Sequence, residues 1–135
     1  MTVQDYLKQY NNHKRRMNCY LEEYEHEADV IMEIQNNLNV IPTKQRRKAE
    51  ENLDKCVMFC NGLKDRAKES ANMMDEIQAM IESIPGLEGE ILKLRYIDGL
   101  IWEDICESVN YSWRGVFHKH DKALQMVDEK LKAER

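Results

Sequence analysis

The sequence has little glycine and proline, with five glycines and two prolines among 135 residues. These two residue types interrupt regular backbone structure, so few positions favour a break. The chain is instead rich in Glu, Lys, Leu, Met and Ala, which have high helix propensities. This balance predicts long helices and an all-α fold. The length fits one domain, or one small domain with a helical extension.

Long hydrophobic runs are also missing. No stretch of about 18 consecutive apolar residues occurs, which argues against a membrane-spanning helix. The first residues, Met1–Asp5, lack the basic and then apolar pattern of a signal peptide. We therefore expect a cytoplasmic protein without a membrane partner. In that reducing compartment, the cysteines should be free thiols: Cys19, Cys56, Cys60 and Cys106.

Positive charge is not in excess, because the formal net charge is −5. A protein that coats nucleic acid without specificity would be basic, so that class is disfavoured. A local DNA-binding face is still compatible with this charge, because a duplex responds to the charges that it meets.

Motifs of catalysis and metal binding are absent as well. The chain has no glycine-rich phosphate loop, no nucleophile elbow and no paired carboxylates outside charged helix faces. His118 and His120 would point about 200° apart on a helix, so they do not favour one shared ion. Cys56 and Cys60 share a helix face, but no second pair has zinc spacing. We predict neither an enzyme nor a metal or cofactor site.

Apolar residues recur at steps of three and four from Val3 to Leu38. A seam of this kind predicts a helix packed along its length on another helix, as in a coiled coil. Only His13 and Glu27 interrupt it. The pattern ends at Asn36–Pro42, after which Thr43 can cap a second helix. The seam residues are Val3, Tyr6, Tyr10, His13, Met17, Tyr20, Tyr24, Glu27, Ile31, Ile34 and Leu38.

A second seam follows between Leu53 and Ile84. Two long amphipathic helices with a short connection predict an antiparallel hairpin. Ile84–Gly86 ends the second helix, so we predict a hairpin domain for assembly over residues 1–84 and another domain over residues 85–135. The second seam consists of Leu53, Cys56, Cys60, Leu63, Ala67, Ser70, Met74, Ile77, Ile81 and Ile84.

The apolar surface of this hairpin is wider than one partner helix can cover. Either a second copy or the C-terminal part would cover the remainder, and a homodimer with twofold symmetry is the prediction. Ile31 and Ile77 lie in the seam, where a charge would destabilise such a dimer. The residues that widen the surface are Tyr6, Tyr10, Tyr20, Tyr24, Leu21, Met73, Met74 and Met80.

Three shorter helices are predicted beyond Gly86, over residues 88–97, 100–109 and 113 to about 132. Asn110 and Tyr111 form the turn before the third helix, and Ser112 is its expected N-cap. Two helices joined by such a turn form the motif that places its second helix in the major groove of DNA. Val116, Ala123, Leu124 and Val127 should pack on the preceding helices.

The sequences LKLRYIDGLIWEDI at residues 92–105 and YSWRGVF at residues 111–117, with Ala123 and Leu124, resemble the C-terminal DNA-binding region of sigma-70-type factors. The layout is similar to small phage and prophage sigma-like regulators, including late-gene regulators of the RinA and ArpU kind. The motif covers roughly residues 84–127, and residues 1–83 share only the helical layout.

Several positions depart from the family pattern. Ile101 replaces a small hydroxyl residue and Cys106 replaces alanine. Trp113 and Gly115 stand where polar residues are common, so a preference for a DNA sequence does not carry over.

The resemblance implies a sequence-specific transcriptional regulator that binds double-stranded DNA, with RNA polymerase as a further candidate partner. Three cations on the third helix face one nearby acid, Asp121, and Arg114 is long enough to bind guanine in a bidentate manner. Two alternatives stay open: a DNA-packaging protein similar to a terminase small subunit, and a helical adaptor that binds protein. The residues expected at the DNA are Ser112, Trp113, Arg114, Gly115, His118, Lys119 and Lys122.

Overall fold

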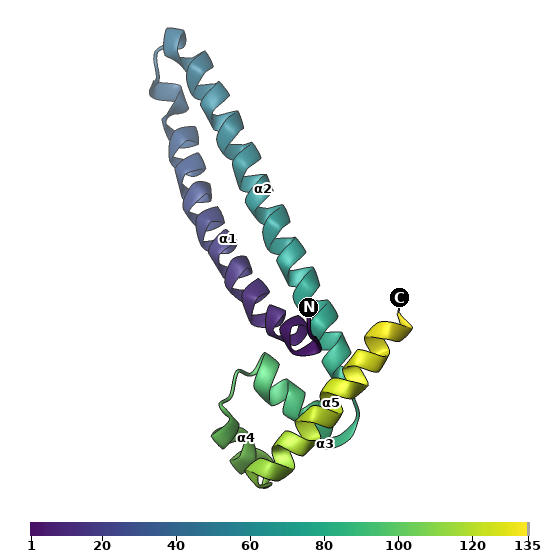
Figure 1. The fold of residues 1–135 in the computed structure, drawn as a ribbon. Coiled ribbons are helices and arrows are strands. Elements are labelled where there is room, and N and C mark those ends of the chain that lie inside the picture. The colour runs from purple at the N-terminus through teal and green to yellow at the C-terminus, as the bar shows by residue number, and fades with distance from the viewer. Residues whose placement is uncertain (135) are drawn as a thin grey trace. The chain divides into compact units, whose positions relative to one another are not determined.

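The computed structural model describes residues 1–134, and these form helices and connecting turns without a strand (Figure 1). The all-α prediction is confirmed. No described helix combines the length and apolarity needed to cross a bilayer. The elements are α1 (Val3–Asn37), the 3-10 turn η1 (Leu38–Val40), α2 (Thr43–Glu82), α3 (Gly86–Leu92), the π-helical turn η2 (Lys93–Ile97), α4 (Trp102–Val109) and α5 (Trp113–Ala133).

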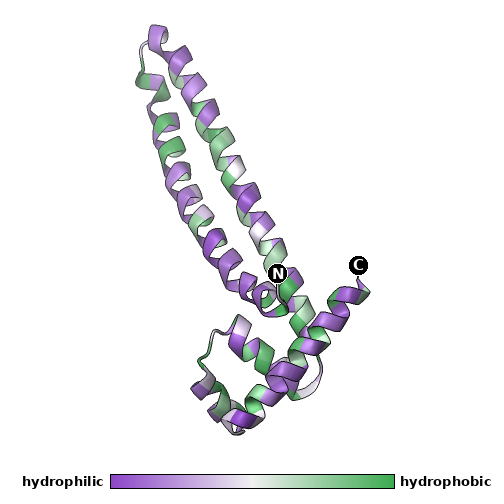
Figure 2. Ribbon diagram, in the orientation of Figure 1, coloured by the Kyte–Doolittle hydropathy of each residue, from purple (hydrophilic) through white to green (hydrophobic). Residues whose placement is uncertain are grey.

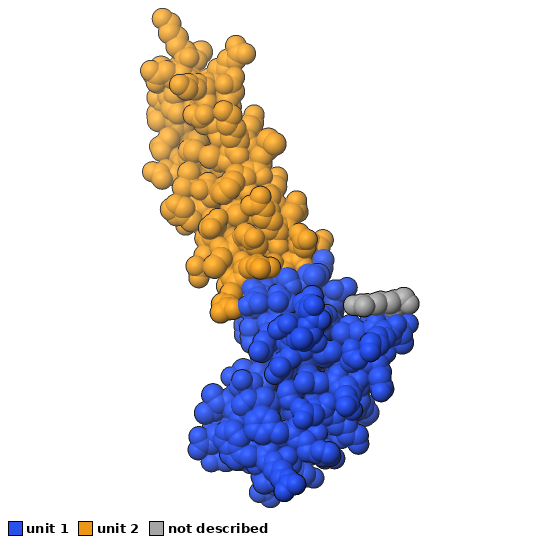
Figure 3. All heavy atoms as spheres, viewed as in Figure 1, with its two compact units in different colours: residues 1–14, 72–135 blue, residues 15–71 orange. Residues whose placement is uncertain are grey.

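The chain forms two compact units (Figure 3). The hairpin unit consists of residues 15–71. The C-terminal unit combines residues 1–14 with the segment that begins at residue 72. The end of α2 and the helices after residue 85, which the sequence pattern assigns to two domains, therefore lie in the same unit.

In the hairpin unit, α1 and α2 run antiparallel with the predicted seams facing each other, and the seam residues of α1 in this unit are half-buried. Apolar residues recur along both helices (Figure 2). Leu63 and Ala67 are buried, and the Cys60 thiol donates a hydrogen bond to the carbonyl of Tyr24 at 3.7 Å. Burial raises the pKa of this thiol. The Pro42 carbonyl accepts from the Arg46 amide at 3.1 Å, so α2 begins one residue earlier than a cap at Thr43 would allow.

The C-terminal unit has a core to which every long helix contributes. Tyr10 and Met80, predicted to widen an exposed apolar surface, are buried here because the C-terminal helices cover them. Ile77 also packs inside the chain, so this part of the seam is not available to a second copy. The buried residues are Leu7, Tyr10, Ile77, Met80, Ile81, Ile84, Leu92, Tyr96, Ala123 and Val127.

A second cluster holds the three short helices together. Ile91, Ile105, Cys106 and Val116 are its buried members, so Val116 packs on the preceding helices as predicted. The start of α3 lies so close to the end of α2 that a Cβ atom on Gly89 would collide with the carbonyl of Ile84. α3 therefore continues directly from α2 with almost no spacer.

Candidate nucleic-acid interface

The turn between α4 and α5 has the predicted form. Asn110 ends α4 in the left-handed region with a φ of 58°, which asparagine tolerates better than most residues. The Tyr111 amide then donates to the carbonyl of Cys106 at 3.2 Å. The Ser112 hydroxyl accepts a hydrogen bond from the Gly115 amide at 3.2 Å, which caps α5 as expected.

The start of α4 differs from its prediction, because Leu100 and Ile101 lie outside the helix. The preceding helix uses this segment to end: Gly99 has a φ of 72°, and the Leu100 amide bonds to the carbonyl of Leu94 at 3.0 Å. Ile101 precedes α4 without a side-chain cap. The first backbone amides of α4 therefore donate no hydrogen bond to the side chain of residue 101.

Arg95 braces this segment from η2. Its guanidinium donates to the carbonyl of Leu100 at 3.0 Å and lies 4.7 Å from the centre of the Trp102 ring. A cation over an indole face is attracted by the negative potential of the ring. Arg95 thus fixes the entry into α4, a role that the sequence pattern did not indicate.

One face of α5 is buried, and this packing sets which face of the helix points to solvent. Val116, His120, Ala123 and Val127 form the buried face. The oxygen of Tyr96 lies 2.7 Å from Nε2 of His120, and Trp102 packs edge-on against the imidazole. Burial is the main cause that lowers the pKa of His120 and raises that of Tyr96, so a neutral imidazole faces a protonated phenol. The tautomer of the imidazole sets which of the two groups donates the hydrogen bond.

The opposite face of α5 carries Arg114 and His118, both exposed. Trp113 lies on one flank with 52% of its surface exposed, and Phe117 is 38% exposed. The ring centres of Trp113 and Phe117 are 5.8 Å apart, and those of Phe117 and Trp102 are 4.8 Å apart. Phe117 was missed as a candidate, although its spacing of four residues from Trp113 places both on one helix side.

The other flank of α5 carries the lysines, and here the charge balance differs from the prediction. Lys119 lies 3.4 Å and Lys122 3.7 Å from the same carboxylate oxygen of Glu88 on α3. A hydrogen bond from its own backbone amide lowers the pKa of Glu88, and the two lysines add to this effect. The prediction from sequence set only Asp121 against the cations and did not include Glu88.

Gly115 has a structural reason to lack a side chain. A Cβ atom there would lie 3.2 Å from the ring of Tyr111, so the glycine lets the turn fold back on α5. The seven predicted residues therefore divide by position. Ser112 and Gly115 shape the turn, Arg114 and His118 form the exposed centre, and Trp113 and the lysines lie on opposite flanks.

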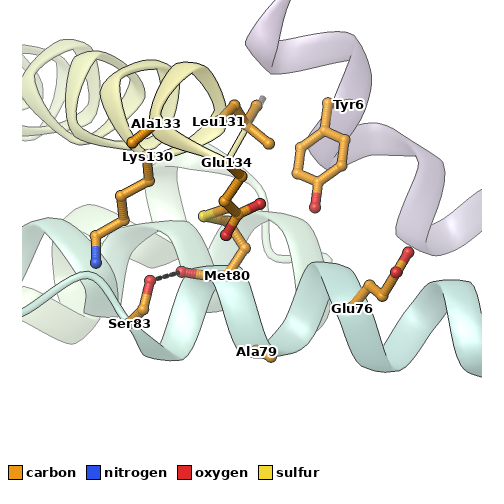
Figure 4. Close-up of a pocket in the computed structure, with 9 residues that line it drawn as sticks. All are labelled: Tyr6, Glu76, Ala79, Met80, Ser83, Lys130, Leu131, Ala133 and Glu134. Carbon is orange, nitrogen blue, oxygen red and sulfur yellow. Dashed lines mark hydrogen bonds between the residues drawn. The ribbon is translucent and has the colours of Figure 1, made fainter.

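A hollow of about 660 Å³ lies in the C-terminal unit, away from the start of α5, between the ends of α1, α2 and α5 (Figure 4). Its charged residues are Glu76, Lys130 and Glu134, and no ion pair joins them within residues 1–134. The Ser83 hydroxyl donates a hydrogen bond to the carbonyl of Met80 at 2.6 Å, so it is not paired with a general base that could activate it as a nucleophile. Across the same residues, no three His, Cys, Asp or Glu side chains gather around a point where a metal ion could bind.

No protein-family model matches the chain, and the curated proteins and solved structures contain no significant match to it. The resemblance to the sigma-70-type module rests on the residues of the chain itself.

Proposed function

We propose that this protein is a sequence-specific DNA-binding transcriptional regulator of the sigma-like kind, encoded by a phage or prophage. The first two turns of α5 enter the major groove, and Arg114 contacts a base edge. Lys119 and Lys122 approach the phosphates on one flank. The protein performs no chemistry, so it acts by occupying a site or by recruiting RNA polymerase.

The observation that carries this proposal is the exposed centre of α5, presented on a rigid support. Arg114 and His118 project from a helix whose reverse face is fully packed and whose start is fixed by Asn110 and Ser112. A DNA-reading helix needs this combination, because base contacts discriminate only when the side chains are held in register.

Selection of binding sites from a random DNA pool, followed by affinity measurement, tests the proposal. Arg114→Ala should weaken binding to the selected site by roughly 1–3 kcal/mol and relax the preference at one base pair. Arg47→Ala is the matched control, because Arg47 is an exposed arginine of the hairpin unit that pairs with Glu51 on its own helix. It should leave the affinity unchanged.

Equal affinity of the wild type and the folded Arg114→Ala variant for the selected site would exclude α5 as the reader. If the wild type binds no DNA even at low salt, DNA binding itself is wrong.

A second candidate is a helical adaptor that binds protein through the same module. The observation in its favour is the exposed aromatic pair Trp113 and Phe117 beside the acidic α4, where Glu103, Asp104 and Glu107 are exposed. Aromatic residues are enriched in the centres of protein interfaces. Loss of RNA polymerase binding on Trp113→Ala, in a protein without DNA affinity, would favour this candidate.

A further inference from the structure

The outer face of α1 in the hairpin unit carries two positive charges before Cys19 and two negative charges at matching distances after it. Arg15 and Arg16 precede Cys19 by about one turn, and Glu22 and Glu23 follow it by about one turn. At about 3.6 residues per turn, all four charged residues project within roughly 60° of the direction of Cys19. All five residues are exposed, so this stripe, residues 15–23, forms one surface of the helix.

The order of charges determines how two such surfaces fit. In a parallel pair, arginines would face arginines and glutamates would face glutamates. In an antiparallel pair with its twofold axis at Cys19, Arg16 meets Glu23 of the second copy and Arg15 meets Glu22 of the second copy. Each contact occurs twice by symmetry, and an interface of this kind is complementary to itself.

We propose that the protein forms a twofold-symmetric homodimer in which the outer faces of two α1 helices pack antiparallel around Cys19. The inference does not depend on the proposed DNA binding. It differs from a dimer through the long seams, because α1 and α2 of one chain already turn those seams towards each other.

Apolar surface next to the stripe adds to the charge pairing. Phe59 of α2 lines a hollow with Glu22, Glu23 and His26, and 49% of its surface is exposed. An arginine that pairs with Glu23 would arrive beside this ring, where an aromatic face attracts a cation. Exposed ion pairs contribute little to the free energy of association, and salt screens them. Burial of the Phe59 ring in the dimer would add a contribution that salt does not screen.

Charge reversal in the full-length chain tests the pairing. Arg16→Glu or Glu23→Arg alone should raise the dissociation constant of the dimer at least tenfold in sedimentation equilibrium. The double variant exchanges the charges and should restore dimerisation. Glu25→Arg is the matched control, because it makes the same charge change at an exposed position of α1 that projects about 120° away from the direction of Cys19, and it should leave the dimer unchanged.

Cross-linking tests the position of the axis. Cys19 of two copies should approach closely enough for a disulfide, which requires Cα atoms roughly 4.4–6.8 Å apart. Mild oxidation should therefore give a covalent dimer that Cys19→Ser abolishes. Circular dichroism confirms that each variant is folded.

Three outcomes would overturn the proposal: a monomer at every concentration, a double variant as weak as the single variants, or a dimer that oxidation does not link through Cys19.

Discussion

His120 is a polar side chain inside the C-terminal unit, and its partner explains why it is tolerated there. Buried polar groups are costly unless they are hydrogen-bonded, and the Tyr96 hydroxyl supplies that bond at 2.7 Å. Trp102 packs edge-on against His120 and also contacts Phe117, so an indole covers one side of the imidazole. Burial favours the neutral form of this imidazole, because a charged ring would lose its contact with water there.

Acid should therefore destabilise the protein through His120. Its pKa is lowered in the folded state, mainly by burial, so the unfolded chain binds this proton first as the pH falls below about 6.5. The stability that neutral His120 provides is present above that pH and is lost towards the lower folded pKa. We expect the melting temperature to fall between pH 7 and pH 5 in thermal scans.

Two glutamine variants separate this effect from general titration. His120→Gln should melt at a lower temperature at pH 7 but lose part of the pH dependence. His118→Gln, which changes an exposed histidine two residues away, should keep the pH dependence of the wild type. The same slope in all three proteins would show that His120 is not the group that titrates.

Single residues with strong local preferences were predictable from the sequence. Asn110 in the left-handed turn and Ser112 as the N-cap follow from residue type, because each preference depends on neighbours within four positions. The burial of His120 also follows the period of Val116, Ala123 and Val127, although its bond to Tyr96 does not. Residue types specify a buried face, but not which polar partner lies across it.

At the scale of helices, α5 is held differently on its two sides. Aromatic residues fill the side towards α4, and Lys119 and Lys122 on the other side form ion pairs with Glu88 of α3. This carboxylate neutralises part of the charge that the proposed DNA contact would use. The helix that supports α5 thus also limits its attraction for phosphate.

Removing that carboxylate should strengthen DNA binding, if the proposed function is correct. Glu88→Gln releases Lys119 and Lys122, so the affinity for all DNA sequences should rise. The dependence of log K on log salt should steepen by about 0.9 for each additional phosphate that the lysines neutralise. Filter binding or fluorescence anisotropy over a series of salt concentrations measures both quantities.

Glu90→Gln is the control for net charge, because Glu90 is an exposed glutamate of the same helix. It changes the charge by the same amount without freeing the lysines. An equal rise in affinity for both variants would mean that only total charge matters, and no rise for either would mean that the lysines do not reach phosphate.

Helices were easier to predict than their contacts. The steps of three and four residues predicted the seams of α1 and α2, because side chains on one face of a helix share that period. The pairing of Glu88 with Lys119 joins residues 31 positions apart, and no local pattern contains it. The π-helical turn η2 was also missed, since Lys93–Ile97 carries an ordinary helical sequence.

At the scale of the molecule, the proposed DNA-binding module does not contain its own complete core. Leu92, Tyr96 and Val127 pack against Leu7 and Ile81, which belong to the first and second helices. Each buried side chain of this size contributes roughly 1.5–3 kcal/mol relative to exposure. A segment cut at residue 86 would leave that face in water.

Two fragments test this dependence. The segment 86–135 alone should melt without a cooperative transition. A chain that joins residues 1–14 to residues 72–135 through a short Gly-Ser linker keeps the whole C-terminal unit and should melt cooperatively. Circular dichroism at increasing temperature compares them, and a cooperative transition in the shorter fragment at the same temperature would contradict the expectation.

The close approach at Gly89 has a consequence for the descent of this protein. Under the proposed function, surface charges such as Arg114 would change whenever the DNA target changes, and relatives would soon differ there. A side chain at Gly89 would collide with the backbone of Ile84, and a left-handed Gly86 stands three residues earlier. These two glycines should therefore stay unchanged during divergence for longer than the residues proposed to contact DNA, so that distant relatives would be recognised by this tight connection between α2 and α3.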